Sequence, residues 1–157
     1  MNIFVLDEDP QKAAELHCDQ HVIKMTLETA QMLSTSVLFY QKDESGLYKM
    51  THKNHPCSVW ARESRGNFIW LASLGAHLAN EHKVRYSPKK PHASLKVIQR
   101  ALSFQKTIPE GPMTAFAQAM PKEYKSDNAV LSYQNFYRNE KRFATWRAPR
   151  KTPNWAM

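Results

Sequence analysis

Apolar residues recur at helical spacing in four stretches of this chain, and segments rich in proline and polar residues separate them. The first stretch covers residues 10–40, where the pattern allows a break near Cys18, and the second covers residues 59–86. A third helix is expected over residues 92–104 and a fourth over residues 127–146. The pattern therefore predicts a protein dominated by helices.

The segments outside these stretches lack helical periodicity. Residues 3–6 form a short apolar run that predicts a strand or an extended segment, and Asp9 is a candidate N-cap for the first helix. Residues 107–125 hold four Pro or Gly residues and are expected to form an irregular loop, while residues 147–157 are expected to form an extended strap. We therefore expect a mainly α fold, a compact helical bundle with long loops and an extended C-terminal strap.

Length and charge narrow the organisation and the partners. A chain of 157 residues suffices for one well-buried domain, so residues 1–157 are expected to form a single domain. The 22 Lys and Arg residues exceed the 14 Asp and Glu residues, which gives a net charge of +8. Such a charge attracts polyanions, of which double-stranded DNA is the first expectation and an anionic membrane surface the alternative.

Neither disulfide bonding, secretion nor membrane insertion is indicated. Cys18 and Cys57 are too few for a disulfide framework and are expected to be buried or idle thiols. No stretch approaches the roughly 20 apolar residues of a membrane span, and the N-terminus lacks a basic leader with a long apolar run. We expect a soluble monomer in the cytoplasm, or in the host cytoplasm if a phage carries the gene, with no membrane partner.

Ionisable side chains gather along one side of the first predicted helix. At about 100° per residue, six polar residues fall within an arc of roughly 80°. They are His17, His21, Lys24, Glu28, Gln31 and Thr35. The opposite side carries Val22, Ile23, Ala30, Leu33 and Val37. Titratable groups are costly to bury unless they are paired, so such a cluster on a core-packed helix is a candidate site.

Two interpretations of this polar stripe are open. A solvated face would make Lys24 and Glu28, at i and i+4, an ordinary surface ion pair. The narrow polar arc, crowded at its edges by Met25 and Leu27, instead favours a groove with apolar walls.

Four short motifs carry a resemblance to a known family. They are Asn-Ile-Phe-Val at residues 2–5, Asp19-Gln20-His21 with Glu28 seven residues beyond, Asn54-His55-Pro56, and Pro91-His92-Ala93-Ser94. In this order they resemble the pyrimidine-dimer DNA glycosylase family, the small endonuclease V-type repair enzymes of phages and some bacteria. The likeness is strongest over residues 1–35 and weakest in the C-terminal third. It implies an all-helical single domain that combines a glycosylase with an abasic-site lyase.

The resemblance implies catalytic roles for a carboxylate and an amine. Glu28 is the candidate to stabilise the positive charge that develops on the sugar as the glycosidic bond breaks. In the family the amine is the chain's own N-terminus, exposed after the initiator Met is removed from a small second residue. Here the second residue is Asn2, which is too bulky for efficient Met removal.

Two amines could therefore form the Schiff base. The Met1 α-amine belongs to a class with a reference pKa of about 8, whereas Lys24 belongs to a class at about 10.4 and would need desolvation or a positive neighbour. We favour Met1. If neither amine reaches the sugar, the protein would be a glycosylase without lyase activity.

The histidines and Asn54 have both structural and functional interpretations. His21 would orient a phosphate or a reacting proton, or would be a structural histidine. His17 and His21 at i and i+4 lack the Glu of a zincin motif, so no metal is predicted, and the mechanism requires no cofactor. Asn54 could cap the second helix, and His55 could fix its loop. His92 could cap a helix or contact DNA, and the resemblance is the reason to list His55 and His92 as DNA-binding candidates. His17 and Asn54 are DNA-binding candidates as well.

Basic and aromatic residues interleave near the C-terminus. The candidates for phosphate contact are Arg138, Lys141, Arg142, Arg147, Arg150 and Lys151. The alternative is a solvated basic face in which Phe143 and Trp146 anchor the strap to the core.

The sequence supports the hypothesis of a DNA glycosylase with abasic-site lyase activity on damaged or modified pyrimidines, pyrimidine dimers first. The alternatives are a noncatalytic nucleic-acid-binding protein and a related enzyme that acts on another modified base. Glu28 and an amine brought together at the base of one basic groove would favour catalysis. A Glu28 side chain on a convex solvated face would favour binding alone.

Overall fold

The computed structural model describes all residues 1–157 and contains six α-helices, three short 3₁₀ turns and no strand. The helices are α1 (Pro10–Leu16), α2 (Asp19–Tyr40), α3 (Pro56–Glu63), α4 (Arg65–Tyr86), α5 (Leu95–Leu102) and α6 (Ala129–Glu140). The 3₁₀ turns are η1 (Gln105–Thr107), η2 (Lys122–Tyr124) and η3 (Asn154–Ala156). The expected mainly α fold is confirmed.

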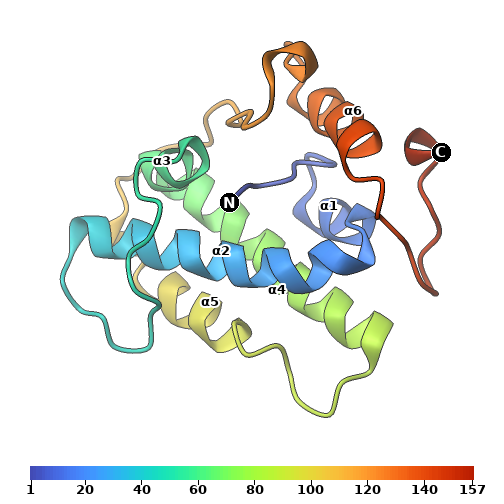
Figure 1. The fold of residues 1–157 in the computed structure, drawn as a ribbon. Helices are drawn as coiled ribbons and strands as arrows, with labels where there is room; N and C mark the ends of the chain where they lie inside the picture. The colour runs from blue at the N-terminus through green and yellow to red at the C-terminus, as the bar shows by residue number, and fades with distance from the viewer.

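Two 22-residue helices, α2 and α4, form the centre of the molecule. They cross in Figure 1, and α2 also packs against α3 and α5 while α4 packs against α1. A glycine allows the close approach, because a Cβ built on Gly75 would lie 2.6 Å from Thr29 Cγ2 and 2.8 Å from Ile98 Cδ1. The close packing of α2, α4 and α5 therefore depends on the missing side chain at this position.

The N-terminal segment is extended and almost completely buried. Ile3, Phe4, Val5 and Leu6 all lie in the hydrophobic core although none is in a helix or a strand. The Phe4 ring stacks on that of His21 with centroids 4.7 Å apart. The side chain of Gln134 on α6 donates to the Leu6 carbonyl at 3.0 Å. The segment is thus held between α2 and α6, as the extended alternative predicted.

Two breaks interrupt the long stretches of helical spacing, and the sequence pattern indicated only the first of them. The break near Cys18 exists, with α1 ending at Leu16 and α2 beginning at Asp19. The single helix predicted over residues 59–86 is wrong, because an extended Ser64 separates α3 from α4 and its side chain accepts from the Asn67 amide at 3.1 Å. Apolar spacing continues through this one-residue break, so periodicity alone does not reveal it.

The last two helices are shorter than predicted. The third begins at Leu95 instead of residue 92, and it ends at Leu102. The fourth ends at Glu140 rather than Trp146, because the following residues turn back onto α1 and α2. The Trp146 indole donates to the Leu16 carbonyl at 2.9 Å, and the Asp19 amide donates to the Thr145 carbonyl at 2.7 Å.

A buried ionic network fixes this strap. Arg85 is fully buried and contacts Asp19 Oδ1 and Glu81 Oε2, each at 3.1 Å. Arg150 of the strap contacts Glu81 Oε1 at 2.6 Å and Glu15 at 3.6 Å. Every charge in this network has an opposite partner, which offsets the desolvation of the buried groups.

Both cysteines are buried free thiols, as expected. None of the helices has the length and apolar character needed to cross a membrane.

Gly75→Ala should destabilise the protein, although the same change in an open helix would stabilise it by about 1 kcal/mol. Overpacking a filled core costs about 1–3 kcal/mol, and the new Cβ would meet Thr29 Cγ2 at 2.6 Å. We expect a net loss of roughly 1 kcal/mol in the free energy of unfolding, measured by urea denaturation. Thr29→Ser removes the obstructing methyl group, so the double variant should be more stable than additivity predicts. Additive effects would contradict this packing.

Candidate active site

Glu28 on α2 lies beside two amines. Its Oε2 atom lies 3.7 Å from the Met1 nitrogen and accepts from the Asn2 amide at 3.2 Å. Its Oε1 atom lies 3.8 Å from Lys24 Nζ, one helical turn earlier. The Glu28 side chain is only 12 % exposed, so it does not lie on a convex solvated face. The carboxylate and the N-terminal amine, 27 residues apart in sequence, therefore share one site.

The two residues that carry these amines differ in burial. The side chain of Met1 is 4 % exposed although the residue as a whole is half-buried, whereas the Lys24 side chain is 64 % exposed. The difference arises because residues 3–6 run through the core, while Lys24 projects from the solvent side of α2.

His55 lies within electrostatic reach of the same pair. Its Nδ1 atom caps α3 by accepting from the Cys57 amide at 3.1 Å, so the neutral ring carries its proton on Nε2. Burial, followed by the positive charge of the N-terminus, lowers the pKa of His55, and Glu28 opposes this shift. His55 therefore stays neutral at pH 7. The adjacent Asn54 is exposed and does not cap the helix.

His17 and His21 are both buried, and the His21 ring stacks on that of Phe4. His21 Nδ1 lies 2.8 Å from the Tyr137 hydroxyl, and His17 Nδ1 donates to the Ala13 carbonyl at 2.7 Å. Burial lowers the pKa of His17 to about 4 and that of His21 to about 3, the latter with help from the positive charges around it. His17 Nε2 has no hydrogen-bond partner.

The residues of the predicted polar stripe therefore do not all lie on one exposed surface. His17 is the C-cap of α1 and fully buried, so it exposes no atom to a DNA ligand. Thr35 is buried too, where its hydroxyl accepts from the Thr51 amide at 3.1 Å. Ile23, expected on the core face, is 42 % exposed. The break at Cys18 rotates His17 out of the helical register, which explains the first difference.

His92 has a structural position. Its Nδ1 atom accepts from the Ser94 amide at 3.1 Å, and its Nε2 atom donates to the Ile23 carbonyl at 3.0 Å. Both ring nitrogens are occupied, but the N-cap of α5 is Ser94, so His92 holds the loop before the helix and does not cap it.

The C-terminal basic residues fall into two groups. Arg138, Arg142 and Lys151 are exposed and have no carboxylate partner. The other three contact side chains of the protein itself. Lys141 Nζ lies 5.0 Å above the Phe136 ring, Arg147 contacts Asp19 at 3.7 Å, and Arg150 contacts Glu81.

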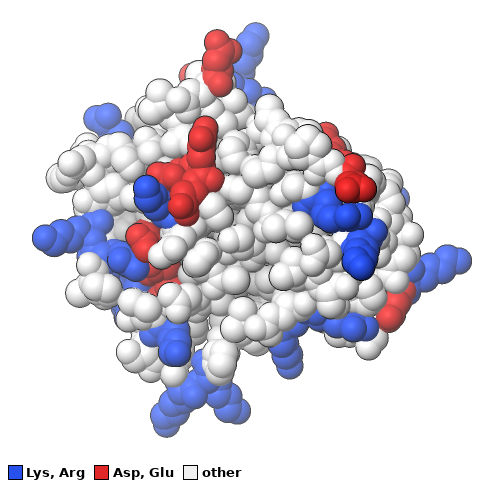
Figure 2. All heavy atoms as spheres, turned by 180° about the vertical axis from the view of Figure 1, so that it is seen from behind, with Lys and Arg blue, Asp and Glu red and all other residues white.

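The face behind that of Figure 1 carries both signs of charge. Figure 2 shows Lys and Arg mainly around its edges, acidic groups beside some of them, and a largely uncharged centre. The net charge of +8 therefore does not form a continuous basic surface on this face.

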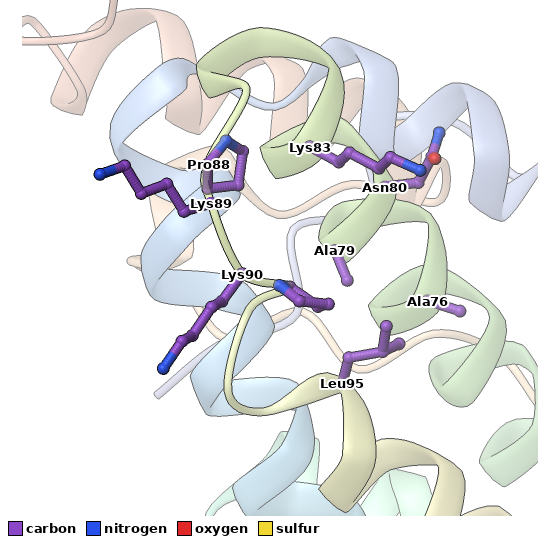
Figure 3. Close-up of a pocket in the computed structure, with 9 residues that line it drawn as sticks. Ala76, Ala79, Asn80, Lys83, Pro88, Lys89, Lys90 and Leu95 are labelled. Atoms are coloured by element: carbon purple, nitrogen blue, oxygen red, sulfur yellow. The ribbon is translucent and has the colours of Figure 1, made fainter.

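A hollow of about 390 Å³ lies elsewhere, between α4, α5 and the loop that joins them. Its lining includes Lys83, Lys89 and Lys90 but neither Glu28 nor Met1. In Figure 3 the side chains of Lys89 and Lys90 point away from this hollow, so their ammonium groups do not converge on a ligand. No three His, Cys, Asp or Glu side chains lie close enough together to hold a metal ion.

Sequence reasoning missed the residues that hold the N-terminus. The Asn2 side chain contacts Tyr133 on α6, Cys57 on α3 and the Ala119 carbonyl. Tyr133 lies 131 residues from Asn2 in sequence. Helical periodicity marks Tyr133 only as a core position, so no local signal identifies this contact.

A family model described as pyrimidine dimer DNA glycosylase matches residues 1–94, which include Met1, Glu28, His55 and His92. No curated protein and no solved structure matches the chain significantly.

Acid should destabilise the protein through its buried histidines. Between pH 6.5 and about 4 the unfolded chain binds a proton at His17 that the folded protein does not bind. The unfolded state then holds more protons, so the free energy of unfolding falls as the pH falls through this range. A shift of this size corresponds to about 3 kcal/mol.

The test is denaturant unfolding of His17→Asn across pH 4–7. Asn keeps a donor for the Ala13 carbonyl and does not titrate, so the loss of stability on acidification should be smaller than in the wild type. His52→Asn is the control, because His52 is exposed and Asn tolerates its positive φ of 49°. An identical pH dependence in His17→Asn and the wild type would refute this assignment.

Proposed function

The chain belongs to the pyrimidine dimer DNA glycosylase family, and from this membership we propose that it cleaves the glycosidic bond of damaged pyrimidines in duplex DNA, pyrimidine dimers first, and then acts as an abasic-site lyase. The observation that carries the proposal is the contact between the Met1 amine and the Glu28 carboxylate. A nucleophilic amine and a carboxylate are the two groups that this chemistry needs.

The reaction proceeds through a Schiff base. The unprotonated Met1 nitrogen attacks C1′ of the damaged nucleotide, and the C1′–base bond breaks with its electron pair leaving on the base, which takes up a proton. Loss of a proton from the nitrogen and opening of the C1′–O4′ bond, with protonation of O4′, then give an imine at C1′. Removal of a C2′ proton finally expels the 3′-phosphate and breaks the strand.

Glu28 stabilises the positive charge that develops on the sugar in the first step. A carboxylate is most effective in this role when water does not screen it, and the Glu28 side chain is only 12 % exposed. Its position 3.7 Å from the amine also places it beside the atom that the amine attacks.

Met1 is preferred over Lys24 as the nucleophile. Lys24 is largely solvated, whereas Met1 is held at the carboxylate by a buried segment. An α-amine is also the weaker base by about two pKa units as a class, so more of it is unprotonated at neutral pH.

The substrate must be deformed to reach this site. A glycosidic bond inside a duplex becomes accessible when the helix is bent or a nucleotide leaves the stack. We assign phosphate contacts to the exposed Arg138, Arg142 and Lys151, and a contact to the nucleotide at the site to His55, whose Nε2–H is free to donate. The protein acts as a monomer and needs no cofactor for these steps.

Glu28→Gln should abolish glycosidic cleavage while leaving DNA binding largely intact, because it keeps the size of the side chain and removes its charge. Loss of such electrostatic stabilisation costs on the order of 100-fold or more in rate. The assay is ultraviolet-irradiated duplex DNA treated with alkali, which converts every abasic site into a strand break. DNA binding by the wild type without any cleavage would instead support the noncatalytic binding protein. Activity only on other modified DNA would support the related enzyme.

Borohydride should trap a covalent protein–DNA adduct, and peptide mapping should place it on the N-terminal peptide. Lys24→Gln should still form the adduct, whereas a chain extended by several residues before Met1 should not, because its amine lies outside the site. An adduct on Lys24 would overturn the choice of Met1. Cleavage after alkali without any adduct would make the protein a glycosylase without lyase activity.

Binding to duplex DNA should weaken steeply with salt, and the triple variant Arg138→Gln, Arg142→Gln, Lys151→Gln should flatten that dependence. Each lost phosphate contact lowers the slope of log K against log salt by about 0.9. Arg150→Gln is the matched control, because this residue is paired with Glu81 and should affect stability instead of the slope. Fluorescence anisotropy over a salt series measures both, and an unchanged slope in the triple variant would remove these residues from the DNA surface.

A further inference from the structure

The side chain of Asn2 is held by four contacts from four parts of the chain. Its Oδ1 atom accepts from the Ile3 amide at 2.8 Å and lies 3.2 Å from the Tyr133 hydroxyl and 3.5 Å from Cys57 Sγ. Its Nδ2 atom donates to the Ala119 carbonyl at 2.9 Å. The amide is thus surrounded by the N-terminal segment, α3, α6 and the loop before η2.

The groups around this side chain require an acceptor at one atom and a donor at the other, which asparagine provides. Burial raises the pKa of Cys57 to about 11, so its thiol is protonated at neutral pH and can donate to Oδ1. The single Tyr133 proton is within reach of both Oδ1 and the Ala117 carbonyl, the latter at 2.6 Å. Aspartate would place an oxygen against the Ala119 carbonyl, and leucine would lose all four contacts.

The same residue carries the backbone that meets Glu28. The Asn2 amide nitrogen donates to Glu28 Oε2 at 3.2 Å, and the Met1 nitrogen lies 3.7 Å from that oxygen. Met1 itself makes no hydrogen bond, so the direction of the first peptide unit depends on what holds Asn2 and on the packing of the Met1 side chain against the core. Residues 3–6 hold the segment from the other side because they are buried.

We propose that Asn2 is a positioning residue, whose side-chain amide locks the first peptide unit and keeps the terminal amine beside Glu28. This inference rests on the proposed function, in which that amine attacks the sugar. The lock acts on the second residue, so it also aligns the Asn2 nitrogen with Glu28 in any chain from which Met1 has been removed. A misplacement of about 1 Å in a reacting group costs on the order of 100-fold in rate.

The test compares the variants Asn2→Leu and Asn2→Asp with the wild type. The control is Asn80→Leu, which makes the same Asn-to-Leu substitution at an exposed position of α4. For Asn2→Leu we expect kcat for glycosidic cleavage to fall roughly 10- to 100-fold, with KM for irradiated duplex DNA within about threefold of wild type. Asn2→Asp keeps the acceptor and loses the donor, so its kcat should lie between Asn2→Leu and the wild type. The control should match the wild type. Intact mass identifies the first residue of each protein.

A second measurement is independent of activity. An amine-selective acylating reagent, followed by mass spectrometry, gives the rate at which the N-terminal amine is modified in the folded protein. This rate should rise in Asn2→Leu and, less, in Asn2→Asp, and stay unchanged in Asn80→Leu. If Asn2→Leu does not fold, Asn2→Asp alone is decisive in both measurements.

The outcomes separate the lock from the chemistry. If the Asn2 variants keep the wild-type kcat and the wild-type acylation rate, the lock is overturned. It is also overturned if kcat falls, KM rises and the melting temperature falls together while the amine is acylated no faster than in the wild type. A wild-type protein that cleaves no damaged DNA would overturn the proposed function. In that case the acylation rates alone would still confirm or refute the lock.

Discussion

The candidate site depends on one constraint, the passage of an extended N-terminal segment through the core. Residues 3–6 are buried without a helix or strand to satisfy their backbone, so their positions depend on side-chain packing and on donors supplied by other elements. Phe4 stacks on His21, and α6 supplies Gln134 to the Leu6 carbonyl. Because an amine at a free chain end would otherwise be mobile, this burial is what brings it to Glu28.

Helix α6 must therefore be held firmly, and the C-terminal strap does this through buried charges. The Tyr137 hydroxyl of α6 accepts from the Cys18 amide at 2.9 Å, where α2 begins. Further along the strap, Arg150 pairs with Glu81, which also pairs with the fully buried Arg85. Removing one partner of such a network leaves an uncompensated buried charge, which is strongly destabilising. The strap, which follows α6 in the chain, is thus tied to α1, α2 and α4.

Local patterns in the sequence were sufficient for the helical class, the break near Cys18 and the pairing of Lys24 with Glu28, because each arises from residues close in sequence. The break at Ser64 escaped because apolar spacing runs through it. The burial of His17 and the pairing of Arg150 with Glu81 escaped for a different reason. Arg150 meets Glu81 across 69 residues, and no periodicity encodes such a contact. The meeting of Met1 and Glu28 was expected from the family resemblance, whereas the contacts of Asn2 were not.

The arrangement of one carboxylate between two amines has an electrostatic consequence for the proposed chemistry. A carboxylate next to a single amine favours the protonated form, which cannot attack a sugar. Here Glu28 also faces Lys24 Nζ at 3.8 Å, so the group carries a net charge of +1 when both amines are protonated. Loss of the Met1 proton leaves Glu28 and Lys24 as a neutral pair, so no unbalanced negative charge remains in a site that must receive DNA. The neutral His55 ring adds no further charge to this group. In the proposed reaction Lys24 is therefore the counter-charge of Glu28, and the Met1 amine is the nucleophile.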